Sequence, residues 1–427
     1  MRLLFVVPYV PNPVRVRPYE FIRALRRAGD SITLATVWTT DDEKRDIERL
    51  KALGVEILAQ PMPAWRSATN SALALPSSTP LQSVYSWHPV QAQRTVDAAM
   101  SGKFDAVHVE HLRGSRYGVA ILEAMTAAPT KRIPVVWDSV DCISYLFEQA
   151  AQSSSSLKGR MMTRLELGRT RKYEGTVLRR FDCTLVTSSV DKQALLQLAT
   201  AYGVPSGALE SPDDLVEVVP NGVDLNTFAF ADCNGREPAR IVFSGKMSYH
   251  ANVTAAVHLV KEIMPQVWAQ RPDAEVWIVG KDPTAEVSAL ATPSDGESRS
   301  RVVVTGAVPE MRSYIAGATI AVAPLLYGAG IQNKVLEAMA CGTPVVATPQ
   351  ASQSLTAQPG VELMVAPDAV TFANALIELL QSPDRRMQMG LAGRAFVERE
   401  HSWTHAAEHL HTIYERCAAR LRVAAAT

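Results

Sequence analysis

The sequence predicts an α/β protein with two doubly wound, Rossmann-like domains. Short apolar runs alternate with amphipathic stretches along the whole chain, and such strand–helix alternation is typical of parallel sheets covered by helices. The chain also has 427 residues. This is more than one core usually holds, because single hydrophobic cores stop growing at ~250–300 residues.

The expected strands form two series. Several are apolar without alternation, as is typical of parallel strands buried on both faces. The first series comprises the runs at 3–7, 31–36, 55–58, 106–109, 135–137, 184–187 and 216–219. The second comprises the runs at 240–243, 275–279, 301–305, 320–323 and 344–347. Helical patterns lie between them, for example at 18–28, 192–199, 253–268 and 334–340.

A turn-rich segment separates the two series. Asn221 and Gly222 precede a polar stretch at 224–238, and this density of turn residues indicates an interdomain linker. We therefore expect one domain at 1–222 and a second at 223–400. Two such domains create a cleft, and open α/β sheets bind ligands beyond the carboxyl ends of their strands.

Charge and cysteine content exclude several classes of protein. The 43 basic residues balance 43 acidic residues, which argues against a nucleic-acid binder. The five cysteines are scattered without a CxxC pair, so neither a disulfide framework nor a zinc site is expected. No apolar run is long enough to span a bilayer, and the run at 3–7 is too short for a signal peptide. We expect a soluble, cytoplasmic protein.

The segment at 321–347 (AVAPLLYGAGIQNKVLEAMACGTPVVA) carries the most informative motif. A strand precedes a loop with Gly328 and Gly330, and a helix begins near residue 332. Glycines let a ligand approach the backbone, and the unpaired amides of a helix start favour anions. Lys334 adds a cation suited to a diphosphate, although a lysine at a helix start opposes the helix dipole.

Glu337 lies four residues after Asn333, so the two side chains share one face of the helix. A carboxylate one turn beyond a phosphate site can accept two hydrogen bonds from the vicinal hydroxyls of a ribose. The motif therefore indicates a nucleotide site. An ordinary capped helix with a solvated Glu337 fits the same spacing.

The block GIQNKVLEAMACGTPVVAT at 330–348 resembles the signature of the GT-B nucleotide-sugar glycosyltransferases, specifically glycosyltransferase family 4. Within that family it is most similar to the exopolysaccharide-type sugar transferases of the PEP-CTERM/exosortase system, which carry a similar GIQNKxLEAMA block. Further segments resemble the family in the same order: VVPNGVD at 218–224, FSGKMSYHANVTA at 243–255, IVGKDP at 278–283 and VTGAVPEM at 304–311.

The resemblance implies a GT-B fold, in which two Rossmann-like domains face each other across a cleft. A C-terminal helix, here about 401–427, would cross back onto the first domain. Glu337 would bind the donor ribose, and charge neutralisation would stabilise the diphosphate. The residues expected around the donor diphosphate and sugar are Lys246, Gly330, Ile331, Gln332, Asn333 and Lys334.

The sequence departs from the family pattern on the donor side. Many members have a second glutamate, which contacts the donor sugar, where this chain has Ala329. The family also usually has an arginine followed by a lysine on the phosphate side, where this chain has Lys246 alone. These departures leave the identity of the donor sugar open.

The loop after the first expected strand is basic. It carries Arg15 and Arg17 where many family members have glycine, and the corresponding loop of the subgroup is also basic. Two interpretations are open: one of the arginines faces the donor phosphates, or both are solvated on a rigid loop.

His111 is the expected catalytic residue. It follows the expected strand at 106–109, near the point where the family places a histidine against the donor sugar. An imidazole can donate to a hydroxyl and can pass protons near neutrality. Glu110 is a second candidate at the same strand end, whereas His108 is expected to pack in the sheet. A plain surface loop is the alternative.

Asp138 and Asp141 follow the next expected strand and resemble an Asp-rich loop of the subgroup. We expect them either to contact the acceptor or to orient His111. The same residue types also form ordinary helix N-caps, so that interpretation stays open.

A basic stretch runs from Lys158 to Arg180, with eight basic residues against Glu166 and Glu174. Such a helix can lie on an anionic membrane surface or receive an anionic acceptor. The Ser- and Pro-rich region at 65–90 is a candidate acceptor- or membrane-facing loop. A solvated helix and an irregular connection are the alternatives.

The resulting hypothesis is a retaining, metal-independent glycosyltransferase that moves a sugar from a nucleotide sugar, most simply a UDP- or GDP-sugar, to a hydroxyl acceptor. No cofactor or nucleic acid is expected, and the acceptor is a glycan, a lipid-linked sugar or a small molecule. The expected setting is cell-surface polysaccharide or glycoconjugate synthesis, peripheral at the inner face of the membrane. The alternatives are a nucleotide-sugar epimerase or phosphorylase of the same fold, and a non-catalytic two-domain sugar-binding protein.

Overall fold

The computed structural model describes residues 1–128, 132–153, 157–202, 215–232, 235–292, 300–328 and 330–426, with side chains except at 150–165 and 424–426. These residues form two compact units. The first comprises Met1–Pro220 and Trp403–Thr427, and the second comprises Asn221–Ser402. The chain therefore leaves the first unit once and returns to it with its last helix.

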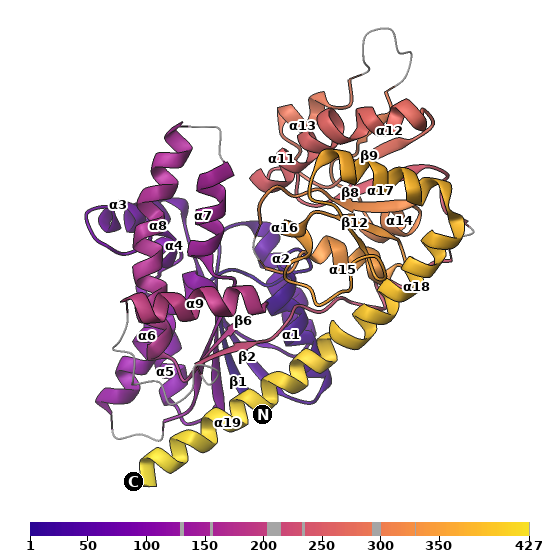
Figure 1. Ribbon diagram of the computed structural model, residues 1–427. Coiled ribbons are helices and arrows are strands. Elements are labelled where there is room, and N and C mark those ends of the chain that lie inside the picture. The colour runs from indigo at the N-terminus through magenta and orange to yellow at the C-terminus, as the bar shows by residue number, and fades with distance from the viewer. Residues whose placement is uncertain are drawn as a thin grey trace. The chain divides into compact units, whose positions relative to one another are not determined.

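The first unit is built on a parallel sheet of seven strands in the order β3-β2-β1-β4-β5-β6-β7 (Figure 1). Each strand coincides with an apolar run that the sequence predicts as a strand. The strands are β1 (Arg2–Val7), β2 (Ser31–Trp38), β3 (Glu56–Pro61), β4 (Ala106–Glu110), β5 (Val135–Val140), β6 (Cys183–Val186) and β7 (Val216–Val218).

Helices cover both faces of this sheet. They are α1 (Val16–Arg27), α2 (Asp41–Ala52), α3 (Ala64–Ala74), α4 (Leu81–Tyr85), α5 (Pro89–Met100), α6 (His111–Ala127), α7 (Ile143–Ser153), α8 (Leu157–Val177), the 3-10 turn η1 (Leu178–Arg180), α9 (Ser189–Tyr202) and α19 (Trp403–Ala426). Successive side chains of a strand point to opposite faces. Accordingly, Leu3 and Phe5 of β1 pack in the core with α1, α2 and α19. Leu4 and Val6 pack in the core with α5, α6 and α9.

The second unit repeats the design with a parallel sheet of six strands in the order β10-β9-β8-β11-β12-β13. Its strands are β8 (Arg240–Ser244), β9 (Glu275–Val279), β10 (Val302–Val304), β11 (Ile320–Ala323), β12 (Val345–Ala347) and β13 (Met364–Val365). Its helices are α11 (His250–His258), the π turn η3 (Leu259–Ile263), α12 (Met264–Gln270), α13 (Ala285–Ala289), α14 (Met311–Ala316), α15 (Asn333–Ala340), α16 (Pro349–Ser352), α17 (Ala369–Gln381) and α18 (Pro383–Glu400).

Three local features differ from the sequence-based expectation. The helix expected at 253–268 contains the π turn η3, which ends two residues before Pro265. A proline ring clashes with the preceding turn and removes one N–H donor, which is a physical reason for the irregularity. The segment at 65–90 is not an irregular loop, because it folds as α3, α4 and the start of α5. β13 was not among the expected strands, because its two residues are too few to show a hydrophobic pattern.

The strand orders identify where ligands can bind. In each sheet the order reverses beside the first strand: β1 lies between β2 and β4, and β8 lies between β9 and β11. Open α/β sheets bind ligands at this reversal, beyond the carboxyl ends of the strands. The relevant loops therefore follow β1 and β4 in the first unit, and β8 and β11 in the second.

Candidate active site

The loop after β8 contacts the end of β9 through two glycines, so no side chain lies between the two backbones. Gly245 and Gly280 have φ angles of 150° and 152°, which strongly favour glycine. A Cβ atom on Gly280 would lie 1.7 Å from the Gly245 carbonyl oxygen. A Cβ atom on Gly245 would lie 3.5 Å from the Nζ atom of Lys334. The loop at 245–246, which we call the glycine loop, therefore lies directly beside Lys334.

The loop after β11 leads into the helix that the sequence predicts as the phosphate site. Gly330 has a φ of 66°, and α15 begins at Asn333. The N-cap residue Gln332 makes no side-chain cap hydrogen bond. The first amides of a helix have no partner within it, so the start of α15 presents donors suited to an anion.

Lys334 lies in the first turn of α15 and is partly buried. Its ammonium donates a hydrogen bond to Asn252 Oδ1 at 2.6 Å and lies 4.7 Å from the centre of the Phe243 ring. Burial lowers the pKa of Lys334 to about 8, against the opposing attraction of Glu337. The ammonium is thus a cation held beside the glycine loop in a partly dehydrated setting.

Glu337 lies one turn further along the same helix and is also partly buried. Burial raises the pKa of Glu337 to about 7, and the charge of Lys334 opposes this shift. In its ionised form the carboxylate can accept several hydrogen bonds. The helix therefore presents a cation and, one turn later, a hydrogen-bond acceptor.

The other predicted donor residues differ in exposure. The side chain of Ile331 is buried in the core of the second unit. Asn333 Oδ1 accepts a hydrogen bond from Asn221 Nδ2 at 3.3 Å. The side chain of Lys246 is 53% exposed, and its Nζ atom is 3.8 Å from Asp282 Oδ2. Lys334 is therefore the more buried of the two predicted cations.

Two arginines that sequence reasoning missed bind the carboxyl end of α15. Arg236 donates to the carbonyl oxygens of Cys341 and Gly342 at 3.2 and 2.8 Å. Arg394 donates to the Ala340 carbonyl at 2.7 Å. Cations at a helix carboxyl end satisfy its free carbonyls and complement its dipole. The two arginines therefore hold α15 at its carboxyl end, whereas Lys334 lies at its amino end.

A histidine–tyrosine pair was also missed. His250 Nδ1 lies 2.8 Å from the Tyr327 hydroxyl, and the two rings stack with their centres 5.4 Å apart. The pair joins the start of α11 to the loop after β11. His250 belongs to the segment at 243–255 that resembles the family, which was the one sequence signal for it.

In the first unit, Arg17 forms a buried ion pair with Asp138. Its Nε and Nη2 atoms lie 2.8 and 3.1 Å from the two carboxylate oxygens, and its Nη1 atom donates to the Val219 carbonyl. Arg17 is 5% exposed. Arg15 is more exposed, and it donates to Glu43 Oε1 at 2.7 Å. Of the two arginines, Arg15 is the one accessible to a ligand.

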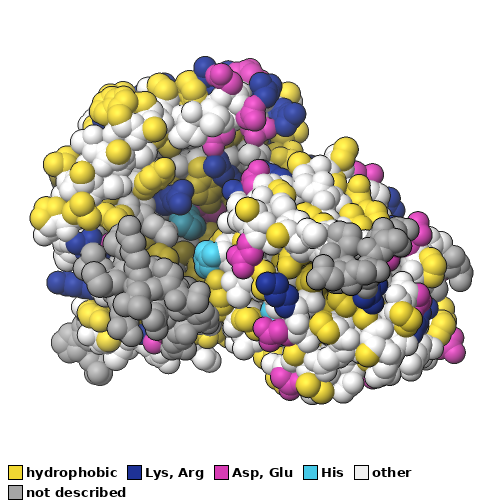
Figure 2. Space-filling view, turned by 90° about the horizontal axis from the view of Figure 1, so that it is seen from above, with side chains coloured by type: hydrophobic (Ala, Val, Ile, Leu, Met, Phe, Trp, Pro, Cys, Tyr) yellow, Lys and Arg dark blue, Asp and Glu magenta, His cyan; other side chains and the backbone are white. Residues whose placement is uncertain are grey.

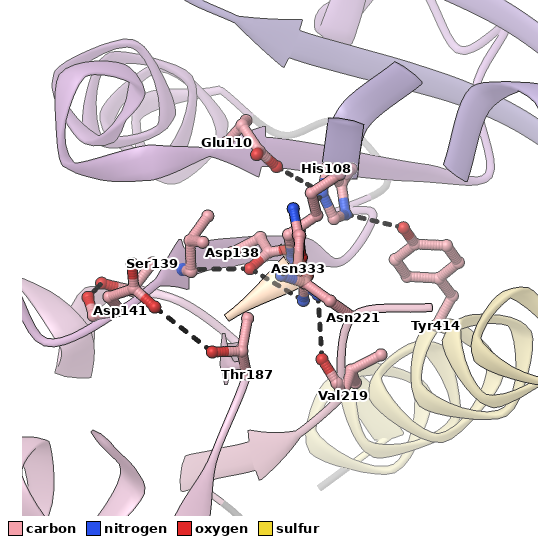
Figure 3. A network of polar contacts seen from close by, with 12 residues as sticks. His108, Glu110, Asp138, Ser139, Asp141, Thr187, Val219, Asn221, Asn333 and Tyr414 are labelled. Atoms are coloured by element: carbon pink, nitrogen blue, oxygen red, sulfur yellow. Dashed lines mark hydrogen bonds and ion pairs between the residues drawn. The ribbon is translucent and has the colours of Figure 1, made fainter. Parts of the chain in front are cut away.

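A network of buried polar side chains lies at the ends of β4 and β5 (Figure 3). His108 lies between the Tyr414 hydroxyl, 2.8 Å from its Nδ1 atom, and the carboxylate of Glu110, 3.5 Å from its Nε2 atom. The oxygen Oδ2 of Asp138 is 3.6 Å from the same Nε2 atom. His108 thus packs inside the sheet, as the sequence predicts.

The same three side chains are placed closely enough to share a cation, since their ligand atoms lie within 4.8 Å of one another. However, Arg17 already bonds both oxygens of Asp138 and supplies a positive charge there. Burial, followed by the charge of Asp138, raises the pKa of Glu110. The cluster therefore fits a buried charge network that holds the two strand ends together.

His111 follows Glu110 as the first residue of α6 and has a φ of 63°. Such a backbone is uncommon outside glycine, and strained residues of this kind gather at functional sites. His111 is partly exposed, whereas Glu110 is fully buried. Burial lowers the pKa of His111 to about 3, and the charge of Arg113 adds to the shift. The imidazole is therefore neutral at physiological pH.

Asp141 lies beyond β5 and accepts a hydrogen bond from Thr187 Oγ1 at 3.2 Å. Burial, followed by the charge of Asp191, raises the pKa of Asp141 to about 7. The first amides of α7 donate instead to Glu174 of α8, from Ile143 at 2.9 Å and from Ser144 at 3.1 Å. Glu174, an acidic residue of the basic stretch, therefore caps α7.

The basic stretch from Lys158 to Arg180 forms α8 and η1, and the side chains of Lys158, Arg160 and Arg164 lie outside the described residues. Arg171 pairs with Glu148, and Arg180 pairs with Glu123, at 2.8 and 3.0 Å. The neighbouring α3 carries large exposed apolar side chains: Trp65 is 61% exposed and Leu73 is 74% exposed. Arg169 of α8 donates to the Leu75 carbonyl at the end of α3.

The surface is mixed in character. On the face drawn in Figure 2, basic, acidic and hydrophobic side chains are intermixed, in keeping with the balanced charge. Within the described ranges, no helix has the length and apolar character needed to cross a bilayer. The four described cysteines, Cys142, Cys183, Cys341 and Cys417, are free and buried, whereas Cys233 lies outside the described residues.

Comparison with known proteins identifies relatives of this chain. Residues 238–382 match the family described as "Glycosyl transferases group 1". Over 214 residues the chain is 34% identical to a GDP-mannose-dependent monoacylated alpha-(1-6)-phosphatidylinositol monomannoside mannosyltransferase of Corynebacterium glutamicum, covering 47% of this chain and 56% of that protein. Over 209 residues it is 31% identical to a phosphatidyl-myo-inositol mannosyltransferase of Mycolicibacterium smegmatis, covering 47% and 52%. The match thus spans little more than half the length of these relatives.

Solved structures share the fold across the whole chain. HepE of Anabaena, determined in complex with UDP, has a TM-score of 0.64 at 13% identity, covering 97% of this chain and 100% of that chain. A glycosyltransferase of Rickettsia africae has the same TM-score and identity, covering 97% of this chain and 98% of that chain. Residues 238–382 are thus similar to the glycosyl transferases group 1 family, and the two parallel sheets are those of the GT-B glycosyltransferase fold.

Proposed function

We propose that this chain is a glycosyltransferase that moves a sugar from a nucleoside diphosphate sugar to a hydroxyl acceptor. The observation that carries the proposal is the convergence of the glycine loop, Lys334, Glu337 and the start of α15 at the switch point of the second sheet. A cation and the first amides of a helix suit a diphosphate, and a carboxylate one turn away suits a ribose. The family match at 238–382 covers the same elements.

In the proposed reaction, Lys334 and the amides of α15 stabilise the negative charge that develops on the leaving diphosphate. Groups aimed at developing charge before the reaction begins are among the strongest contributors to catalysis. Gly330, Ile331, Gln332 and Asn333 supply the surrounding backbone, and Lys246 adds a second cation at an exposed position. We propose, from the family resemblance, that the transfer retains the anomeric configuration and needs no metal or cofactor.

We assign the acceptor side to the first unit. His111 directly follows β4, and its neutral imidazole is suited to hydrogen-bond a sugar hydroxyl. Arg15 is assigned to the donor phosphates because it is the accessible arginine of the loop after β1. Glu110, Arg17 and Asp138 are buried, and we propose that they hold the strand ends behind His111.

The nature of the donor and acceptor is proposed by analogy. One relative is named for GDP-mannose and for a phosphatidylinositol mannoside, and HepE was determined with UDP. These names support a GDP- or UDP-sugar donor and a lipid-linked or glycan acceptor in cell-surface glycoconjugate synthesis. The block at 330–340 supports the narrower proposal of a PEP-CTERM/exosortase-associated exopolysaccharide transferase.

We further propose that the protein works in the cytoplasm at the inner face of the membrane. The exposed Trp65 and Leu73 of α3, next to the basic α8, are suited to an anionic lipid surface. In a sedimentation assay with phosphatidylglycerol vesicles at low salt, the wild type should be found in the vesicle pellet. The Trp65→Ser and Leu73→Ser variants should stay in the supernatant. Val370→Ser, at a site on α17 that is 56% exposed, is the control. Absence of wild-type binding would remove the membrane contact.

The activity is tested by incubating the purified protein with GDP- and UDP-sugars and with lipid and glycan acceptors. We expect release of GDP or UDP that depends on an acceptor, together with a new glycoside detected by mass spectrometry. An epimerised donor without transfer would identify an epimerase. Visible absorption from pyridoxal phosphate would identify a phosphorylase, and binding without turnover would identify a sugar-binding protein.

A further inference from the structure

We propose that Asn252 is a positioning residue for the donor diphosphate, because it fixes the ammonium of Lys334 beside the glycine loop. The inference rests on the proposed function and adds to it a residue of α11, an element that carries none of the predicted donor residues.

Asn252 joins the two parts of the site through both ends of its amide. Its Oδ1 atom accepts a hydrogen bond from Lys334 Nζ at 2.6 Å, and its Nδ2 atom donates to the Lys246 carbonyl at 2.9 Å. An ammonium only donates and a carbonyl only accepts. Both contacts therefore require the same orientation of the amide, and the side chain is 6% exposed.

The amide also lies against the glycine at the turn of the loop. A Cβ atom on Gly245 would lie 2.8 Å from Asn252 Nδ2 and 3.5 Å from Lys334 Nζ. Any side chain at position 245 would therefore displace the amide, whereas the ammonium would lie at ordinary contact distance. Gly245, the amide of Asn252 and the ammonium of Lys334 therefore pack closely together.

Helix stability alone does not explain this asparagine. Asn252 is the third residue of α11, and an asparagine side chain near a helix start often bonds neighbouring backbone groups. Here the side chain bonds no carbonyl or amide of α11 itself among the contacts described. It contacts the loop before the helix and a lysine 82 residues further along the chain.

Fixing the lysine favours binding of a diphosphate for an entropic reason. A lysine side chain has several rotatable bonds, and a ligand that immobilises it bears the cost of the lost rotamers. An ammonium has three donors, of which Asn252 takes one. The hydrogen bond therefore orders Lys334 in advance, and the remaining donors can bind phosphate oxygens.

The test is a double-mutant cycle between Asn252 and Lys334, read out by isothermal titration of UDP and GDP. The variants are Asn252→Ala, Lys334→Met and the double substitution. Asn226→Ala, at an exposed asparagine of the same unit, is the matched control. We expect Asn252→Ala to weaken nucleoside diphosphate binding about tenfold, the size of effect typical for one charge-assisted hydrogen bond.

The decisive result is the effect of Asn252→Ala in the Lys334→Met background. If Asn252 acts through Lys334, the substitution has little further effect there. If the losses of affinity caused by the two single substitutions multiply in the double variant, Asn252 supports the fold in general and the proposal is overturned. Failure of the wild type to bind either UDP or GDP would overturn the proposed function itself, and this inference with it.

A second substitution guards against a folding defect. Asn252→Asp has nearly the same shape, but it replaces the donor to the Lys246 carbonyl and places a carboxylate beside Lys334 in addition to Glu337. We expect it to weaken UDP and GDP binding more than Asn252→Ala, because the carboxylate repels the diphosphate. If Asn252→Asp binds like the wild type while keeping its melting temperature, the proposal is wrong.

Discussion

The hydroxyl of Tyr414 in α19 lies 2.8 Å from the Nδ1 atom of His108 in β4, although 306 residues separate them in the sequence. Both side chains are fully buried. The same helix places His411 Nε2 2.6 Å from Asp30 Oδ2. The last helix is therefore bound into the first unit through polar contacts as well as apolar packing, and it supports the strand that directly precedes His111.

We expect Tyr414→Phe to lower the free energy of unfolding by about 1–3 kcal/mol, because the substitution leaves a buried nitrogen of His108 without its partner. The change removes one oxygen and leaves the aromatic packing intact. Urea denaturation followed by fluorescence measures it. The control is Tyr202→Phe, at a tyrosine that is 44% exposed; equal losses in both variants would contradict the assigned role of the hydroxyl.

Substitutions in α15 test the proposed donor site directly. We expect Lys334→Met to lower kcat/KM on the order of 100-fold, since it removes a charge that stabilises the leaving diphosphate. We expect Glu337→Gln to raise the donor KM by about 10-fold or more, because a charged acceptor becomes neutral. Lys261→Met, an exposed lysine of η3, is the control. Near-wild-type kinetics of both site variants would sink the assignment.

The same two residues predict the pH dependence of kcat/KM. Below a pH of about 7 Glu337 becomes protonated and loses acceptor strength, and above a pH of about 8 Lys334 loses its charge. The profile should therefore be bell-shaped, with its maximum between these values. His111, with a pKa of about 3, adds no limb above pH 5.

Two variants separate the limbs of this profile. Glu337→Gln should flatten the acid limb, because glutamine does not titrate. Lys334→Arg should move the alkaline limb upward, because an arginine stays charged across this range. A wild-type profile that is flat from pH 6 to pH 9 would contradict both assignments.

His111 offers a test that separates side chain from backbone. We expect His111→Ala and His111→Asn both to lower kcat about 100-fold with little change in donor KM, as for the loss of a proton-transferring or hydrogen-bonding group. Asparagine tolerates a positive φ far better than alanine. If His111→Asn is as active as the wild type, the position matters for its backbone and the imidazole is not catalytic.

Much of the fold follows from local patterns in the sequence. Buried parallel strands such as β1 and β11 are runs of apolar residues, because both of their faces are covered. Every strand of three or more residues coincides with such a run. The helices of region 65–90 were missed, since the Ser- and Pro-rich composition masks a short amphipathic pattern. The two residues of β13 are too few for any period to be detected.

The donor motif was also visible in the sequence, because the loop after β11 and the start of α15 are continuous in the chain. Lys334 and Glu337 are three residues apart, and helix geometry alone puts them one turn apart. Asn252 and Arg236, in contrast, reach the same helix from 82 and 105 residues away. One sequence does not show which residues that are far apart in the chain lie close together in space.

The sequence by itself therefore determined the two α/β units, the helix that we propose binds the diphosphate, and the candidates at the strand ends. Only the tertiary structure decided which side chains are accessible: Arg17 and Glu110 are buried, while Arg15 and His111 are open to contact. It also decided which distant residues hold the site, namely Asn252 for Lys334 and Tyr414 for His108. The physical reason is that burial and hydrogen bonding depend on all neighbours in space, whereas strand and helix patterns depend on neighbours along the chain.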